Sequence, residues 1–186
     1  FNINAWQWKG LQNEDSHEQV ADIDYNPTGE EIKSRTELNN LKNTFESKID
    51  YTLPIKIGKI ETGVEAKLVQ GNSDFVFENW DAETDIWNTN SDYSNEMLFK
   101  RNIYSTYATF SSMLLGFSYQ LGLRLEYTDR LLDQKTTGVK YPLELFNYYP
   151  TVHISRPLPK NQQLQLSYSR RINRPQDWQL NPYPGY

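Results

Sequence analysis

The sequence predicts an all-β protein, built as an antiparallel up-and-down meander of about seven strands. Three observations support this prediction: apolar and polar side chains alternate along several stretches, turn-forming residues separate these stretches, and apolar residues nowhere recur at helical spacing. The alternation is clearest from Phe117 to Thr128, where every odd position is apolar or aromatic and every even position is polar or glycine. An unbroken period of two over this length indicates a β-strand with two different faces.

Six further stretches show the same alternation less perfectly, and each is predicted to be a strand. They are residues 1–5, 45–53, 59–68, 98–112, 151–155 and 163–169. The facing of residues 98–112 is ambiguous, because Tyr104 and Phe110 compete with Ile103 and Tyr107 for the apolar side. Residues 30–48 contain good helix formers, but their apolar side chains do not recur at helical spacing.

The connections between these strands alternate between short and long. Short ones are predicted at residues 54–58, 114–116 and 157–161, and long polar ones at residues 9–42, 70–97 and 130–143. Outer-membrane barrels have this arrangement, with short turns on the periplasmic side and long loops outside the cell. The predicted strand lengths of about 9–12 residues also suit a tilted membrane strand. The sequence therefore favours part of a larger outer-membrane β-barrel, with apolar faces on lipid and polar faces on a wet lumen.

Composition disfavours several other classes of protein. The 19 Lys and Arg residues against 24 Asp and Glu give a net charge of -5, which disfavours nucleic acid as a partner. The chain has no cysteine, hence no disulfide, thiol nucleophile or cysteine-based zinc site. Its longest apolar run, residues 113–117, is too short for a membrane helix of roughly 20 residues. No signal peptide precedes Phe1, which indicates a processed chain or an internal fragment.

Four runs of residues resemble one family of outer-membrane proteins. The most specific is YSRRINRP at residues 168–175, followed by Trp178 and by LNP at 180–182. The others are KIDYTLP at 48–54, FVFENWD at 75–81 and GLRLEYT at 122–128. In this order the runs resemble the barrel of TonB-dependent receptors, and most closely the outer-membrane β-barrel receptors of Bacteroidota. The resemblance covers about residues 43–186.

The resemblance implies a receptor in the bacterial outer membrane, with a barrel of about 22 strands closed by a plug. Such a receptor binds a small solute, for example a siderophore, a glycan or a peptide, and imports it with energy delivered through TonB. Because the chain has about seven predicted strands, no plug and a loop-like composition at 182–186, residues 1–186 are expected to be one segment of such a barrel. Its partners would be outer-membrane lipid, the solute and, through the rest of the receptor, TonB.

Aromatic residues in the predicted connection after residue 70 form the candidate solute site. Phe77, Trp80, Trp87 and Tyr93 stand there among Asp, Glu and Asn. Flat rings with polar neighbours can stack on a sugar or another ring-bearing solute while the polar groups hydrogen-bond its edges. The alternative is that these rings only pack the connection against its neighbours.

Arg124, Glu126 and Arg171 are the candidate residues of the lumenal wall, because alternation puts them on polar strand faces. Arg171 is expected to form an ion pair with Glu126 or Glu65, as part of a network that stiffens the wall. The alternative is that such an arginine attracts an anionic solute.

No catalytic, metal or cofactor site is predicted, and we do not expect an enzyme. The sequence contains no G-x-S-x-G, P-loop or dinucleotide-binding motif. Neither of its two histidines has a second histidine at ligand spacing. Asp81, Glu83 and Asp85 are similar to the start of a calcium loop, but Ile86 stands where that motif needs glycine. A solvated acidic loop is therefore expected there.

Two other functions remain open at this point. One is a soluble β-sandwich that binds carbohydrate through Trp80 and Trp87, and the other is a structural or adhesive surface module. The sequences that flank this segment in its gene would distinguish a receptor from a self-contained binding domain. If the barrel interpretation is right, the isolated chain leaves open strand edges and a bare apolar face, so we expect it to self-associate in water.

Overall fold

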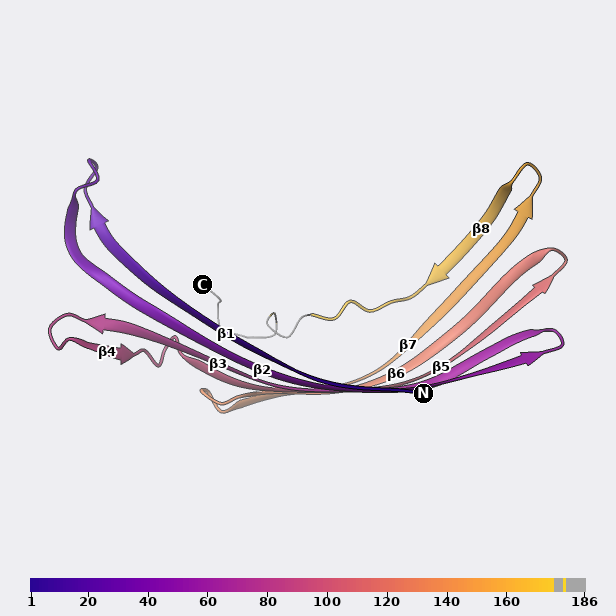
Figure 1. The fold of residues 1–186 in the computed structure, drawn as a ribbon, viewed down its shortest axis with the longest axis horizontal. Helices are drawn as coiled ribbons and strands as arrows, with labels where there is room; N and C mark the ends of the chain where they lie inside the picture. The colour runs from indigo at the N-terminus through magenta and orange to yellow at the C-terminus, as the bar shows by residue number, and fades with distance from the viewer. Residues whose placement is uncertain (176–178, 180–186) are drawn as a thin grey trace.

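The computed structural model describes residues 1–175 and residue 179 of the 186-residue chain. These residues form one antiparallel sheet, whose strands follow one another almost in sequence order (Figure 1). The strands are β1 (Asn2–Ala21), β2 (Pro27–Ile55), β3 (Gly58–Asp81), β4 (Ile86–Thr89), β5 (Asn95–Leu114), β6 (Phe117–Gln134), β7 (Val139–Leu158) and β8 (Gln162–Ser169). The order across the sheet is β1-β2-β3-β5-β6-β7-β8, with the short β4 paired to β3. The predicted all-β meander is confirmed.

Some features predicted near the C-terminus cannot be compared with the structure. Trp178, the run at 180–182 and the loop predicted at 182–186 lie outside the described residues. Among the described residues, no helix is long and apolar enough to cross a membrane.

Tight turns join the strands at one end of the sheet. Between β5 and β6 the chain reverses at Leu115 and Gly116, whose φ angles of 52° and 78° are both positive. Between β7 and β8, Lys160 and Asn161 have φ angles of 62° and 56°. Two consecutive residues with positive φ are typical of a type I′ turn, whose twist matches that of the paired strands. Each strand therefore returns directly beside the strand before it.

The predicted long polar connections are wrong, because most of their residues lie in strands. β2 alone has 29 residues, and β1, β3, β5, β6 and β7 have 18 to 24, against the predicted 9–12. Backbone pairing continues in these parts although neither face is continuously apolar, so the alternation that predicts a strand is lost while the ladder of hydrogen bonds remains. We call residues 9–42, 70–97 and 130–143 the outer hairpins.

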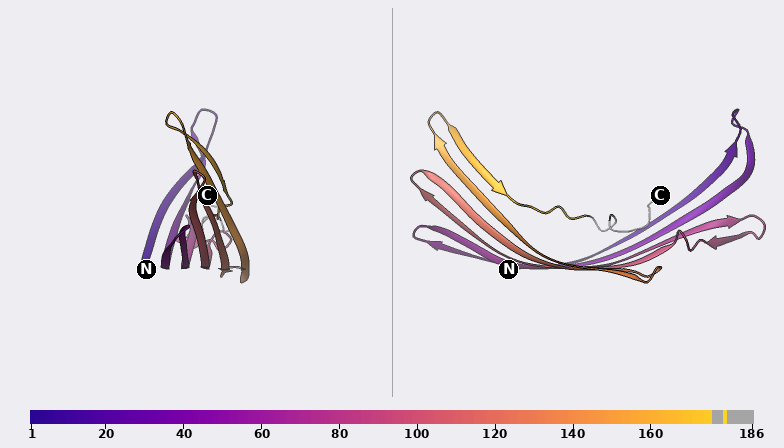
Figure 2. Two further views of the ribbon diagram at one scale, coloured as in Figure 1. Left: turned by 90° about the vertical axis from the view of Figure 1, so that its right-hand side faces the viewer. Right: turned by 180° about the vertical axis from the view of Figure 1, so that it is seen from behind.

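The sheet is curved, and residues 170–175, the described segment that follows β8, lie on its concave side (Figures 1 and 2). Arg174 of this segment forms an ion pair with Glu126 of β6, so the concave face is the one that carries Glu126. Alternation along β6 then places Leu121, Leu123 and Leu125 on the convex face. The predicted separation of leucines from charged residues on this strand is confirmed.

The register resolves the ambiguous facing of β5. Tyr104 is paired with Tyr127 of β6, and Phe110 is paired with Leu121. Directly paired residues of an antiparallel sheet lie on the same face. Tyr104 and Phe110 are therefore convex, and Ile103 is concave.

A mostly apolar surface, which we call the belt, extends across the convex face. It consists of the outward-facing residues within 45–53 of β2, 60–68 of β3, 104–110 of β5, 119–127 of β6 and 146–154 of β7. The stretches on β2, β3, β6 and β7 match the roughly 9–11 residues of a membrane strand. Leu121, Leu123 and Val64 in the belt are 46%, 45% and 51% exposed. Such side chains need an apolar neighbour that the sheet itself does not supply.

The best-buried apolar side chains lie on the concave face instead. Val69, Met97, Phe99 and Leu132 form one cluster from β3, β5 and β6. The described residues form a single sheet. The rival soluble sandwich, which needs two packed sheets, is therefore not the fold of this part of the chain.

Candidate functional site

Charged residues from β3 and β6 form a network on the concave face. The guanidinium of Arg124 donates hydrogen bonds from Nη1 and Nη2 to Oε2 of Glu65, at 3.2 Å each. The Nε atom of Arg124 lies 3.6 Å from Oε2 of Glu126, whose side chain is only 4% exposed. Ser105 of β5 stands directly opposite both glutamates. Because serine is small, the long Arg124 side chain can reach across β5 to Glu65.

The ring of Tyr107 packs close to two cations of this network. Its centroid is 5.9 Å from Cζ of Arg124 and 5.5 Å from Nζ of Lys48. Tyr107 is paired with Gly63, and a Cβ atom at position 63 would come within 2.5 Å of the tyrosine hydroxyl. The ring therefore lies over Gly63, and a larger residue there would displace the surface on which the cations rest.

The segment after β8 supplies a further member of the network, Arg174, which pairs with Glu126. The sequence places Arg171 in the wall, but in the structure Arg171 follows the end of β8 and is exposed. Within the described part of the chain, Arg171 forms no ion pair. The backbone N–H of Arg170 donates to the carbonyl of Pro150 at 3.1 Å, which holds the segment where it leaves the sheet.

Two of the candidate solute residues, Trp80 and Trp87, pair across β3 and β4. They are directly opposite in register, with ring centroids 5.2 Å apart and planes inclined by 60°. Cζ of Arg35 lies 4.5 Å from the centroid of Trp87, and Arg35 also forms an ion pair with Glu78. One face of Trp87 is thus covered by a cation from β2. The cluster ties the β3–β4 hairpin to β2.

The other two candidate solute residues, Phe77 and Tyr93, form a separate pair. Their ring centroids are 5.4 Å apart, with planes inclined by 45°. The backbone N–H of Phe77 donates to Oγ of Ser94 at 3.0 Å, which fixes the turn beside Tyr93. Phe77 and Trp80 are three residues apart on one strand, so alternation directs them to opposite faces. Phe77 and Tyr93 therefore share the face of the Glu65 network, and the two tryptophans face the other way.

In the acidic turn after β3, the carboxylate of Asp81 accepts hydrogen bonds from the turn itself. Oδ1 of Asp81 accepts hydrogen bonds from the backbone N–H groups of Glu83 and Thr84, at 2.9 and 3.3 Å. A side-chain hydrogen bond from Thr84 and these two backbone bonds lower the pKa of the Asp81 carboxyl below its ordinary value. Among the described residues, no group of three or more acids or histidines is arranged to hold a metal ion.

The class of protein follows from comparison with known families. The model of an outer membrane protein beta-barrel family matches residues 9–186. The chain belongs to this family. It is therefore a β-barrel protein of the bacterial outer membrane. No curated protein and no solved structure matches the chain.

Because the chain belongs to this family, the environment expected for each face of the sheet can be inferred. In outer-membrane barrels the outward face carries an apolar band on lipid, and the inward face is polar. The belt of this chain corresponds to the apolar band of such barrels, and we expect the concave face with Glu65, Arg124 and Glu126 to line the lumen. By the same rule we expect the tight turns of β5–β6 and β7–β8 on the periplasmic side and the outer hairpins outside the cell.

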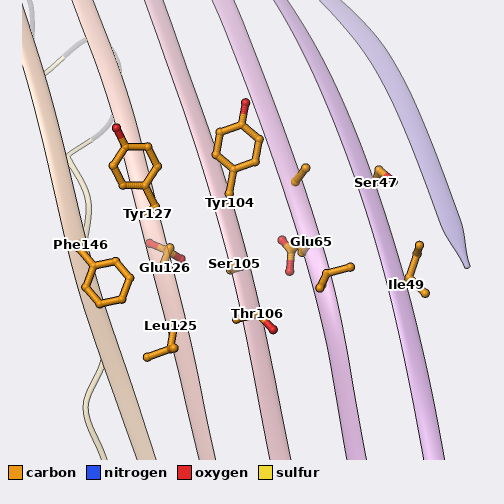
Figure 3. Close-up of a pocket in the computed structure, with 12 residues that line it drawn as sticks. Ser47, Ile49, Glu65, Tyr104, Ser105, Thr106, Leu125, Glu126, Tyr127 and Phe146 are labelled. Atoms are coloured by element: carbon orange, nitrogen blue, oxygen red, sulfur yellow. The ribbon is translucent and has the colours of Figure 1, made fainter.

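A hollow of about 460 Å³ lies in the belt between β2 and β7 (Figure 3). Tyr104, Tyr127, Leu125 and Phe146 border it from β5, β6 and β7, and Ile49 borders it from β2. Because this surface of an outer-membrane barrel is expected to contact acyl chains, we expect lipid rather than a transported solute at the hollow.

The convex face becomes polar directly beyond the belt. The next convex pair after Tyr104 and Tyr127 is Asn102 and Asp129, in which Nδ2 of Asn102 donates to Oδ2 of Asp129 at 3.1 Å. Paired tyrosines at the edge of an apolar surface are typical of the aromatic girdle of membrane barrels.

Sequence reasoning assigns no site role to three residues that shape these sites: Arg35, Tyr107 and Arg174. Arg35 lies in a predicted connection and meets Glu78 across 43 residues of sequence. Tyr107 lies on the strand whose facing is ambiguous, and Arg174 lies beyond the last predicted strand. Only the register of the strands and the path of the segment after β8 bring these residues to their partners.

Proposed function

We propose that the chain is part of the barrel of a TonB-dependent receptor that takes up a scarce solute through the outer membrane. The openness of the sheet carries this proposal. β1 and β8 stand at the two ends of the strand order and do not pair with each other (Figure 2). Seven neighbouring strands that cover only an arc fit a wide barrel better than a small eight-stranded one, whose own side chains fill the interior.

The lumenal wall supports the same proposal. The run at residues 168–175, the most specific part of the resemblance to TonB-dependent receptors, brings Arg174 onto the wall beside Glu126. Around it the wall is polar and ion-paired, which suits a water-filled path rather than a packed core. Transport, and not catalysis, is the function that these features favour.

The partners of the proposed receptor follow from its faces. Outer-membrane lipid contacts the belt. The solute, a siderophore, a glycan or a peptide, enters along the concave face between the outer hairpins. TonB acts through parts of the receptor other than the segment described here.

Uptake by whole cells tests the proposal. Cells with and without the gene are supplied in turn with labelled ferric siderophores, oligosaccharides and peptides, each with TonB present or deleted. We expect one class of solute to enter only when both the gene and TonB are present. Uptake that needs the gene but not TonB would identify a passive pore instead, and uptake of every class without the gene would remove the transport function altogether.

A further inference from the structure

The lumenal wall changes its charge balance along the strands. Near Arg124 the wall alternates basic and acidic residues, and the ion pairs of Glu46 with Lys67 and of Glu65 with Arg124 neutralise it. The next three rows towards the outer hairpins contain no acid. Read across β2, β3, β5, β6 and β7, they are Thr44, Val69, Arg101, Arg130 and Leu143; Lys42, Gly71, Phe99, Leu132 and Tyr141; and Asn40, Ser73, Met97, Gln134 and Val139.

Two arginines of the first acid-free row face each other directly. Arg101 of β5 and Arg130 of β6 are register partners on the concave face. Like charges placed directly opposite on paired strands destabilise a sheet. The Nε atom of Arg130 is buried and has no hydrogen-bond partner within the described part of the chain. A buried guanidinium donor without an acceptor costs folding free energy, so Arg130 does not stabilise the wall in the way that a paired arginine would.

Neighbouring groups add to the positive charge and fix its geometry. Arg174 lies close enough to Arg101 and Arg124 for their charges to repel it. The Arg101 guanidinium carbon stands 5.2 Å from the ring centroid of Phe99, which is itself 5% exposed. A buried ring holds the guanidinium in a fixed plane. Among the residues that the structure describes, Arg101, Arg124, Arg130 and Arg174 therefore gather here with two acids, Glu65 and Glu126.

We propose that Arg101 and Arg130, with Arg174 beside them, form an anion-binding site on the lumenal wall, for a solute that carries carboxylate or phosphate groups. Each guanidinium presents a fork of N–H donors that matches the oxygens of either group. An anion between the two arginines removes their repulsion and satisfies the Arg130 donor. The acid-free rows beyond it attract anions inward from the outer hairpins. This inference rests on the proposed uptake function and specifies the charge of the solute.

Binding to the full-length protein in detergent tests the inference without requiring transport. Titration calorimetry at low salt is carried out with citrate as the carboxylate probe and inorganic pyrophosphate as the phosphate probe. We expect at least one probe to bind the parent protein, and the tighter of the two indicates which group the solute carries. The double variant Arg101→Gln/Arg130→Gln is expected to bind that probe about tenfold more weakly or worse.

Two controls keep the test decisive. Lys100→Gln removes one positive charge next to Arg101 but on the opposite face of β5, and is expected to leave binding unchanged. Arg130→Gln alone removes the repulsion between positions 101 and 130 and keeps Arg101, so we expect this single variant to fold even if the double variant does not. It should also bind the probe more weakly than the parent protein. If neither probe binds the parent, or if Lys100→Gln weakens binding as much as Arg130→Gln, the anion site is refuted. Specific binding together with uptake that is independent of TonB would instead refute only the proposed receptor.

Discussion

The belt and the outer hairpins are made from the same strands, yet their side chains follow different rules. In the belt, every second residue meets lipid, and β6 alternates from Tyr119 to Tyr127 without exception. In the outer hairpins apolar side chains such as Leu132 are buried only in a local cluster, and contacts such as Arg35 with Trp87 replace the alternation. The strand ladder is continuous through both regions. The alternation of apolar and polar residues is therefore imposed by the membrane and not by β-structure itself.

The largest expected effect comes from placing a charge on the lipid side of the belt. Leu123→Arg puts a cation near the middle of the apolar stretch of β6 and should cost about 2–4 kcal/mol of folding free energy. Urea titration of the full-length protein folded into lipid vesicles measures this loss. The matched control is Gln120→Arg on the lumenal face of the same strand, expected to cost about 0.5 kcal/mol or less. Equal costs at the two positions would show that the faces are assigned wrongly.

A smaller loss is expected when the lumenal network loses its central acid. Glu126→Gln keeps the shape of the side chain but leaves Arg124 and Arg174 without their shared negative charge, at a cost of about 1–3 kcal/mol. The same titration compares it with Glu61→Gln, whose partner Lys59 is well exposed, so that this change should cost about 0–1 kcal/mol. If both variants behave alike, burial of Glu126 does not strengthen its ion pairs.

In the outer hairpins the expected effects are local. Trp87→Ala removes a ring pair worth about 0.5–1.5 kcal/mol and should raise hydrogen exchange of the β4 amides. Solute affinity should stay unchanged, because Arg35 already covers the Trp87 ring and the pair faces away from the lumenal side. Tyr93→Ala, on the lumenal side, is the matched variant and should weaken solute binding. Binding that depends on Trp87 and not on Tyr93 would contradict this separation of the two ring pairs.

The smallest effect concerns pH and the turn after β3. Its hydrogen bonds lower the pKa of Asp81 in the folded state, so the turn is fully stabilised above the ordinary carboxyl pKa of about 3.9. This stabilisation is lost as pH falls from there through the folded-state pKa. Exchange of the Glu83 and Thr84 amides, corrected for the intrinsic rate at each pH, should therefore accelerate only below about pH 4. Asp81→Asn should abolish the pH dependence; a transition between pH 5 and 7 would point to another group.

The sequence predicted the belt well and the outer hairpins poorly, for one physical reason. Leu123 and Arg124 lie on opposite faces of β6, and the difference between an apolar and a charged side chain shows this in the sequence. Arg35 and Glu78 both face water, so nothing in their types shows that they are strand partners. The sequence can place the candidate wall residues Arg124 and Glu126 on one face because both lie on an alternating strand. Arg174 cannot be assigned to the wall from the sequence, because the irregular segment beyond β8, and not a strand pattern, brings it to Glu126.

The near-sequential strand order also has a consequence for the time course of assembly. Most strands pair with the strand just before them in the chain, and only β3 and β5 must close over the intervening β4. Closing short loops costs little chain entropy, and contacts between near neighbours form fast. Such a sheet can grow by one hairpin at a time from a free edge. A defect in one hairpin would then delay the strands that follow it and leave those already placed intact.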